Sequence, residues 1–260
     1  MLKFTSIGDC CVDVYPQYNQ SFLGGSAFNV CLAAQKLKTK ASLISAVGTD
    51  DWGKKYISIF PVSSLSGKTS HVEITLDKHR SPSFSKWHLG ALKKFSLNST
   101  HKKFLSTQTA AHCVAIKPLK SILDKFCQMK LPGVFKSADF DGTTPYSFSI
   151  KEILPYLSGL DLIAKSVEDN HSLSYLKKLA QEKNKIILAT YGAQGSWVFN
   201  SSKTFFQPAI KTQAADTTGA GDAYLATFII SYLQTKNIQK AMLLSTQAAT
   251  KTITRLGASA

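Results

Sequence analysis

The segment Asp216-Thr217-Thr218-Gly219-Ala220-Gly221-Asp222 leads directly into an apolar stretch, AYLATFIISYL, at residues 223–233. This stretch is apolar on nearly every helical face, so it predicts a buried helix. Small residues before it let the backbone turn tightly, and a helix N-terminus adds N–H donors and positive partial charge. The junction therefore predicts an anion hole, with Asp222 placed to accept a proton from an attacking hydroxyl.

The same seven residues have a plainer interpretation, in which Asp222 only caps the helix and the glycines only form a turn. The residues alone do not decide between the two. A Walker-type phosphate loop is excluded, because the pattern GxxxxGK[ST] is absent from the sequence.

Away from this segment, short apolar strands alternate with helices, which is typical of a parallel sheet with crossover helices. Residues 71–76 and 83–87 instead alternate apolar and polar side chains, which predicts exposed strands in a small β lid within residues 68–90. We expect one α/β domain over residues 1–260. The expected strands are 2–7, 41–47, 111–116, 137–140, 160–164, 185–190, 196–199 and 204–207, and the expected helices are 27–37, 119–129, 172–182, 223–233 and 238–255.

Composition and charge argue against several classes of protein. The net charge is +15, but the lysines are scattered without a nucleic-acid motif, so we expect no nucleic-acid partner, and a basic surface also attracts ATP. No apolar run is long enough to span a bilayer and the start lacks a secretory signal, so we expect no membrane partner and a cytoplasmic location. The five cysteines have no CxxC spacing, which predicts free thiols rather than a zinc site or disulfides.

Two further segments carry candidate ligand-binding side chains. In Gly24-Gly25-Ser26-Ala27-Phe28-Asn29 the glycine pair permits close backbone approach, and Asn29 can donate and accept hydrogen bonds to hydroxyls. Asp9 and Asp13 follow the first strand, at the edge where open α/β sheets place ligands. Read alone, the first segment favours an ordinary strand-to-helix turn, and the second favours a solvated loop. Trp87, in the lid, is expected to pack in the core, with ligand stacking as the alternative.

Together these segments closely resemble the ribokinase, or PfkB-type, carbohydrate kinase family. DTTGAGD resembles its C-terminal signature and GGSAFN its N-terminal one. Residues 48–53 (GTDDWG), 190–195 (TYGAQG) and 247–258 also resemble family segments, in the right order along essentially the whole chain. The resemblance implies a doubly wound, mostly parallel sheet flanked by helices, with a small β lid.

The resemblance also implies roles for single residues. Asp222 would be the catalytic base of phosphate transfer from ATP to a sugar hydroxyl, and Mg²⁺ would bridge the phosphates. A monovalent cation and a homodimer are left open. The implied anion hole is Gly219, Ala220 and Gly221, the implied sugar-binding residues are Asp13, Gly25, Ser26, Asn29 and Asp222, and the implied nucleotide-binding residues are Thr190, Gly192, Gly195, Thr217 and Gly219.

Within the family, residues 7–17, 90–97 and 137–141 are most similar to fructoselysine 6-kinases, and a fructokinase-like enzyme is the nearest alternative. Two features depart from the family pattern. Ser166 replaces the asparagine of an N-x-x-E segment, so that Asp169 or Glu168 would serve the metal through water, and residues 53–68 are shortened. The altered segment motivates a different alternative, a weakly catalytic relative that senses sugar or nucleotide.

Overall fold

The computed structural model describes residues 1–142 and 144–259. In this part of the chain an eight-stranded sheet runs in the order β14-β13-β12-β11-β10-β9-β1-β4. Neighbours from β4 to β12 are parallel, whereas β13 and β14 are antiparallel additions at one edge. The strands are β1 (Lys3–Ile7), β4 (Lys40–Ile44), β9 (Ala110–Val114), β10 (Phe135–Asp139), β11 (Leu162–Ser166), β12 (Ile186–Thr190), β13 (Ser196–Phe199) and β14 (Thr204–Gln207).

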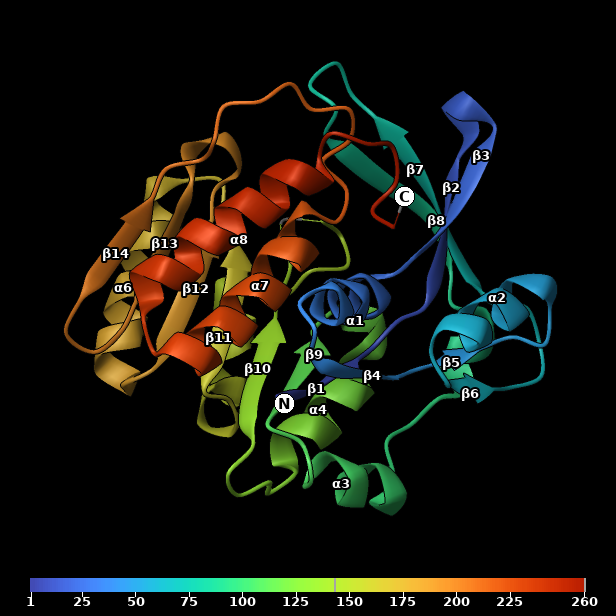
Figure 1. Cartoon of the computed structure of the whole chain (residues 1–260), viewed down its shortest axis with the longest axis horizontal. Helices are drawn as coiled ribbons and strands as arrows, with labels where there is room; N and C mark the ends of the chain where they lie inside the picture. Colours follow the sequence, from blue (N-terminus) through green and yellow to red (C-terminus); the bar gives the residue numbers. More distant parts are fainter. Residues whose placement is uncertain (143, 260) are drawn as a thin grey trace.

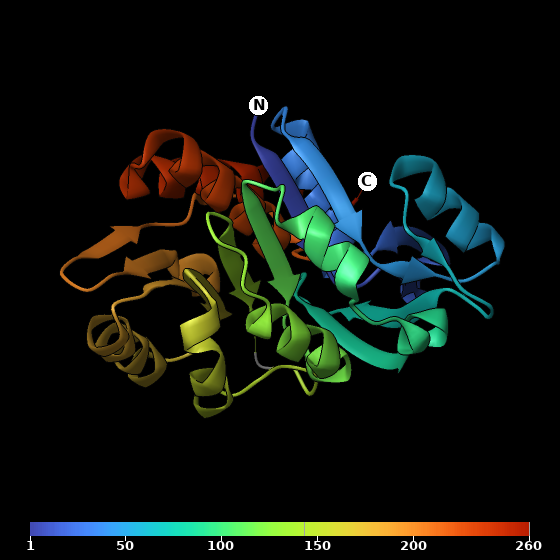
Figure 2. The same cartoon turned by 90° about the horizontal axis from the view of Figure 1, so that it is seen from below.

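Helices cover both faces of this sheet, which confirms the predicted doubly wound α/β arrangement (Figures 1 and 2). On one face lie α1 (Ser26–Lys36), α7 (Ala220–Thr235) and α8 (Ile238–Thr252). On the other lie α4 (Lys120–Gln128), α5 (Ile150–Ile153) and α6 (Asn170–Lys183), while α2 (Asp51–Ile59) and α3 (Ser99–Leu105) lie toward the β4 edge. Short 3₁₀ turns are η1 (Pro16–Tyr18), η2 (Gly90–Lys94), η3 (Lys117–Leu119), η4 (Leu154–Gly159) and η5 (Gly192–Gln194).

The apolar stretch after DTTGAGD forms α7, as predicted, and it is buried between the sheet, α1 and α8. Phe228 and Ile229 on α7 are fully buried and pack in one cluster with Phe4 of β1. The helix begins at Ala220, three residues before the predicted start. Asp222 therefore lies within the first helical turn rather than before it.

A second, four-stranded sheet forms the lid beside the carboxyl ends of the parallel strands (Figure 1). Its order is β3-β2-β7-β8, with β2 (Cys11–Tyr15), β3 (Gln20–Gly24), β7 (Ser70–Leu76) and β8 (Pro82–His88). The sequence located β7 and β8 within residues 68–90, but the sheet also contains the hairpin of residues 11–24. Asp13 thus lies on a lid strand, not in a loop after the first strand. Four of the five β2 residues are buried, so the strand lacks the polar alternation that identified β7.

Other differences from the expected elements are local. The strand expected over 41–47 is divided into β4 and β5 (Ala46–Val47), and β5 pairs with β6 (Ser63–Ser64). In the shortened region, α2 ends at Ile59, two residues before Pro61. All five cysteines are free thiols. Among the described residues, no helix is long and apolar enough to cross a bilayer.

Candidate active site

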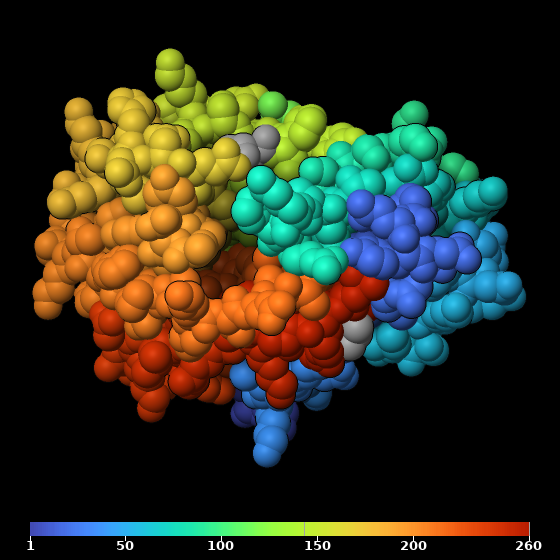
Figure 3. Space-filling model, turned by 90° about the horizontal axis from the view of Figure 1, so that it is seen from above, coloured from blue at the N-terminus to red at the C-terminus, as the bar shows by residue number. Residues whose placement is uncertain are grey.

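A cleft of about 250 Å³ lies between the lid and the carboxyl ends of the parallel strands. Figure 3 shows a hollow between the teal lid hairpin and the orange and gold segments of the main body. Open α/β sheets bind ligands at this edge. Residues proposed from the sequence that line the cleft are Asp13, Gly25, Ser26, Asn29, Thr217, Gly219, Gly221 and Asp222.

Asp222 is held by two side chains from the start of α1. Ser26 Oγ donates to Asp222 Oδ1, and Asn29 Nδ2 donates to Oδ2 over 2.9 Å. Withdrawal from solvent raises the pKa of Asp222 to about 7, while these two hydrogen bonds act in the opposite direction. The nearby carboxylates of Asp139 and Asp9 raise it further. A half-buried carboxylate with a pKa near neutrality has the properties of a general base.

Two acceptor oxygens beside Asp222 are buried without a hydrogen-bond partner among the described residues. They are Asp13 Oδ2 and Asn29 Oδ1, and both residues line the cleft. Burial raises the pKa of Asp13 well above its usual value. Buried polar atoms normally have partners, so these two oxygens are available to accept hydrogen bonds from a ligand.

The two glycines before α1 make this arrangement possible. A Cβ on Gly24 would lie 2.1 Å from Asp13 Oδ2, so only glycine lets the Asp13 carboxylate pack against this strand. Gly25 has a φ of +92°, and a Cβ there would lie 2.7 Å from the Cys11 backbone nitrogen. The glycine pair therefore fixes both the lid carboxylate and the start of α1.

The turn before α7 presents backbone donors to the cleft. Gly219 is in the left-handed region at φ +76°, and no side chain caps the helix. The Ala220 N–H is engaged by the Thr217 carbonyl at 3.2 Å, so it belongs to the turn rather than to the proposed anion hole. The amides of Gly221 and Asp222 lie in the first helical turn, where N–H groups have no intrahelical acceptor. A Cβ on Gly221 would meet nothing within 4 Å, so there is open space beside this residue.

Asp216 connects this turn to two distant segments. Its Oδ1 accepts from the Thr218 backbone N–H at 2.8 Å and from Thr218 Oγ1 at 2.6 Å. Its Oδ2 accepts from Tyr15 Oη of the lid at 2.7 Å and from the Gly257 N–H at 2.9 Å. The carboxylate is 1% exposed. Asp216 thus ties the lid, the turn and the segment after α8 together.

Three residues proposed for the nucleotide do not line this cleft: Thr190, Gly192 and Gly195. Thr190 ends β12, and Gly192 and Gly195 lie in the turn that follows it. Thr190 Oγ1 is 2.7 Å from Ser166 Oγ, and Ser166 does line the cleft. The cleft is therefore connected to this segment through Ser166, the residue that departs from the family pattern.

The acidic candidates for metal binding lie apart from the cleft lining. Asp169 caps α6, and both of its carboxylate oxygens accept from Ser172, at 2.6 and 2.7 Å. The backbone carbonyl of Glu168 accepts from Tyr191 Oη at 2.7 Å. Neither residue is in position to hold a metal ion together with several other ligands, since the described residues contain no group of three or more His, Cys, Asp or Glu suited to that.

A magnesium ion needs no such cage, because it keeps several waters and is usually bound by one or two carboxylates together with substrate phosphates. Asp139 fits that role. It lies at the end of β10 in the cleft, and burial raises the pKa of its carboxyl to about 6.

Several lining residues were not predicted from the sequence, including Asp139, Asp141 and Tyr146. Asp139 and Asp141 lie at the end of β10, just as Asp9 follows the end of β1. The tendency of ligands to bind at the carboxyl ends of parallel strands could therefore have identified them. Asp9 itself accepts from the Ala27 N–H at 3.1 Å and positions α1. Tyr146 lies in a loop where no sequence pattern distinguishes it.

Comparison with known proteins shows what this chain is similar to. Residues 154–260 match the family described as pfkB family carbohydrate kinase. The chain is 27% identical to the fructoselysine 6-kinase of Shigella flexneri, over 99% of this chain and all of that protein. It is 22% identical to a fructosamine kinase of Bacillus subtilis, over 99% and 93%.

Solved structures share the fold. Adenosine kinase from Schistosoma mansoni matches with a TM-score of 0.82 at 15% identity, covering 99% of this chain and 97% of that one. Arabidopsis thaliana ribokinase, solved with ribose and ATP, matches with a TM-score of 0.80 at 17% identity, covering 99% and 94%. The chain therefore has a ribokinase-like fold, and residues 154–260 are similar to the pfkB family of carbohydrate kinases.

Proposed function

We propose that this protein is an ATP-dependent sugar kinase that phosphorylates a fructosamine such as fructoselysine, at its 6-hydroxyl. The observation that carries the proposal is the placement of Asp222, held by Ser26 and Asn29 in the first turn of α7, beside helix-terminal amides and the unpartnered oxygens of Asp13 and Asn29. The similarity to fructoselysine and fructosamine kinases supports the choice of acceptor.

The proposed chemistry uses each of these groups. Asp13 and Asn29 accept hydrogen bonds from sugar hydroxyls and hold the acceptor hydroxyl near Asp222. As that oxygen forms its bond to the γ-phosphorus, Asp222 takes its proton and the bond to ADP breaks. The amides of Gly221 and Asp222 stabilise the negative charge on the transferred group. Mg²⁺, bound with ATP, would neutralise phosphate charge, and the Asp139 carboxylate would help to hold it.

A panel of acceptors tests the function. ADP release from Mg-ATP would be measured with fructoselysine, fructose, ribose, tagatose and adenosine. We expect the highest kcat/KM for fructoselysine. A clear preference for fructose would replace the fructosamine with a fructokinase-like activity. A folded protein that binds ATP and sugar without any turnover would contradict the kinase and favour a sensor.

The pH dependence of the reaction follows from Asp222. Its pKa of about 7 means that the base form is lost as pH falls, so kcat is expected to decline below about pH 7 and to level off above it. The Ser26 hydrogen bond lowers this pKa, so Ser26→Ala is expected to move the acid limb to higher pH. Steady-state rates from pH 5 to 9 measure both. An acid limb near pH 4 in wild type, or an unmoved limb in the variant, would contradict this role.

A further inference from the structure

One wall of the cleft is apolar and aromatic. Trp87 from lid strand β8 meets Tyr146 from the main body edge to face, with ring centroids 5.0 Å apart and an interplanar angle of 81°. The wall is completed by Val72, Phe84 and Ile116. The polar groups assigned to the sugar hydroxyls, on Asp13 and Asn29, belong to other elements, β2 and α1. The cleft thus offers a surface beyond those that a sugar ring's hydroxyls use.

Hydrogen bonds hold the body side of this wall in place. Asp141 Oδ2 accepts from Ser147 Oγ at 2.8 Å and from Thr144 Oγ1 at 3.2 Å, and the two hydroxyls are 2.7 Å apart. The Tyr146 carbonyl accepts from the Lys117 N–H at 2.8 Å. The turn that carries Tyr146 therefore also presents the Asp141 carboxylate to the cleft.

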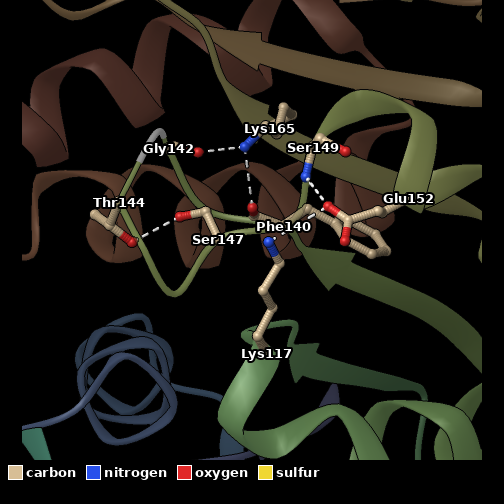
Figure 4. Close-up of polar contacts among 8 residues, drawn as sticks. All are labelled: Lys117, Phe140, Gly142, Thr144, Ser147, Ser149, Glu152 and Lys165. Atoms are coloured by element: carbon tan, nitrogen blue, oxygen red, sulfur yellow. Dashed lines mark hydrogen bonds and ion pairs between the residues drawn. The ribbon is translucent and has the colours of Figure 1, made fainter.

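A buried lysine anchors the start of this turn. Figure 4 shows Lys165 directed at the carbonyl oxygens of Phe140 and Gly142. Its ammonium donates to Phe140 at 3.2 Å, to Asp141 at 2.8 Å and to Gly142. All three acceptors are backbone oxygens, so the lysine shapes the turn, and its charge also acts on the nearby carboxylates of Asp141 and Asp139.

The lid side is fixed by a short chain of hydrogen bonds. The indole N–H of Trp87 donates to Ser70 Oγ at 3.0 Å, and Ser70 Oγ donates to Cys11 Sγ at 3.3 Å. Because its only polar atom is engaged within the lid, Trp87 can offer the cleft only its ring. An aromatic surface of this kind suits methylene groups and cations.

The cleft is lined by acidic side chains, although the chain as a whole is basic. The chain carries +15, yet among the described residues that line the cleft there are five aspartates and no lysine, arginine or histidine. The five are Asp9, Asp13, Asp139, Asp141 and Asp222. Asp9 anchors α1. In the proposed mechanism Asp13 binds hydroxyls, Asp139 helps to hold the metal and Asp222 accepts the proton. Asp141 is the one that lies on the same turn as the aromatic wall.

We infer that Trp87, Tyr146 and Asp141 form a subsite for a positively charged amine substituent on the sugar, with Asp141 pairing the ammonium and the two rings packing against its methylene chain. The inference rests on the proposed function and selects among its acceptors: sugars with an alkylammonium group are preferred over neutral sugars of the same shape. A charge-assisted hydrogen bond and a ring–cation contact act together here.

Two matched ligands test this subsite: N-propyl fructosamine, and 1-O-propylfructose, in which an ether oxygen replaces the amine. Calorimetry without ATP gives their dissociation constants. Wild type is expected to bind the amine about tenfold or more tightly than the ether. In Asp141→Asn, whose side-chain oxygen still accepts from Ser147, that ratio is expected to fall to about threefold or less. Equal affinities in wild type, or an unchanged ratio in Asp141→Asn, would overturn the inference.

A second variant tests the subsite from the lid side, so that its result does not depend on the turn that carries Asp141. Trp87→Leu is expected to weaken both propyl ligands relative to fructose, because both lose the aromatic wall. Phe104→Leu changes an exposed aromatic residue on α3, outside this cleft, and is the matched control. If Trp87→Leu bound the propyl ligands as wild type does, the wall would have no part in recognition. These binding measurements do not require turnover. A failure of the proposed kinase activity would instead appear as the absence of ADP release in the acceptor panel.

Discussion

Replacement of Asp222 by asparagine is expected to lower kcat by about a hundredfold or more while sugar affinity is largely retained. Asparagine keeps the size of the side chain but cannot take the proton of the acceptor hydroxyl. Its amide would face the Asn29 amide, and Asn29 can turn to present its unpartnered Oδ1 instead. The site therefore keeps its shape while losing its base.

The measurement is steady-state kinetics with the best acceptor of the panel, together with calorimetric binding of that sugar. Ser26→Ala is the useful comparison, because it removes a contact to Asp222 but leaves the carboxylate. An Asp222→Asn enzyme with wild-type kcat would remove Asp222 from the mechanism. A variant that loses sugar binding in parallel would assign it to substrate binding instead.

Asp216→Ala is expected to have the largest effect on stability. Four hydrogen bonds end on this buried carboxylate, from Tyr15, from Gly257 and twice from Thr218. Leaving buried donors without an acceptor costs about 1–3 kcal/mol each, and some are re-solvated, so a loss of roughly 3 kcal/mol or more in the free energy of unfolding is expected. Turnover should fall as well, since the turn before α7 loses its anchor.

Denaturant unfolding and kcat measure the two effects. Tyr15→Phe removes one of the four bonds and is expected to cost about 1 kcal/mol, which scales the larger change. An Asp216→Ala protein within about 1 kcal/mol of wild type would mean that water replaces the carboxylate without difficulty, and Asp216 would not be the connection between lid and turn.

The sequence predicted those parts of the structure in which a local pattern and the tertiary environment agree. The hairpin of β13 and β14 has the predicted bounds, and α7 is apolar all round because it is buried all round. The hairpin of β2 and β3 was missed because β2 is covered on both faces. Polar and apolar side chains therefore do not alternate along β2. Its place in the lid is set by pairing with β7, in which Cys11 pairs with Ser70, 59 residues away.

The residues of the candidate site also fall into two groups, those that the sequence predicts and those that only the fold brings together. Segments that need special backbone geometry, the glycine pair before α1 and the turn before α7, are visible in sequence because few residues permit them. Asp141 and Tyr146 are single side chains on one loop, and only the fold brings them to the cleft. Lys165, on β11, contacts the backbone of the same loop, and no sequence pattern indicates this contact. Asp216 was quoted as part of a motif, but its connection to Tyr15 and Gly257 depends on contacts 201 and 41 residues apart.

The two side chains that hold Asp222 are 196 and 193 residues from it in the sequence. Contacts between such remote positions form late, because the entropy of closing the intervening chain must be met before they add stability. During refolding, helical signal should therefore recover well before phosphotransfer does. Activity would then report the final docking of α1 against α7, and a partly folded chain would have a sheet without a working base.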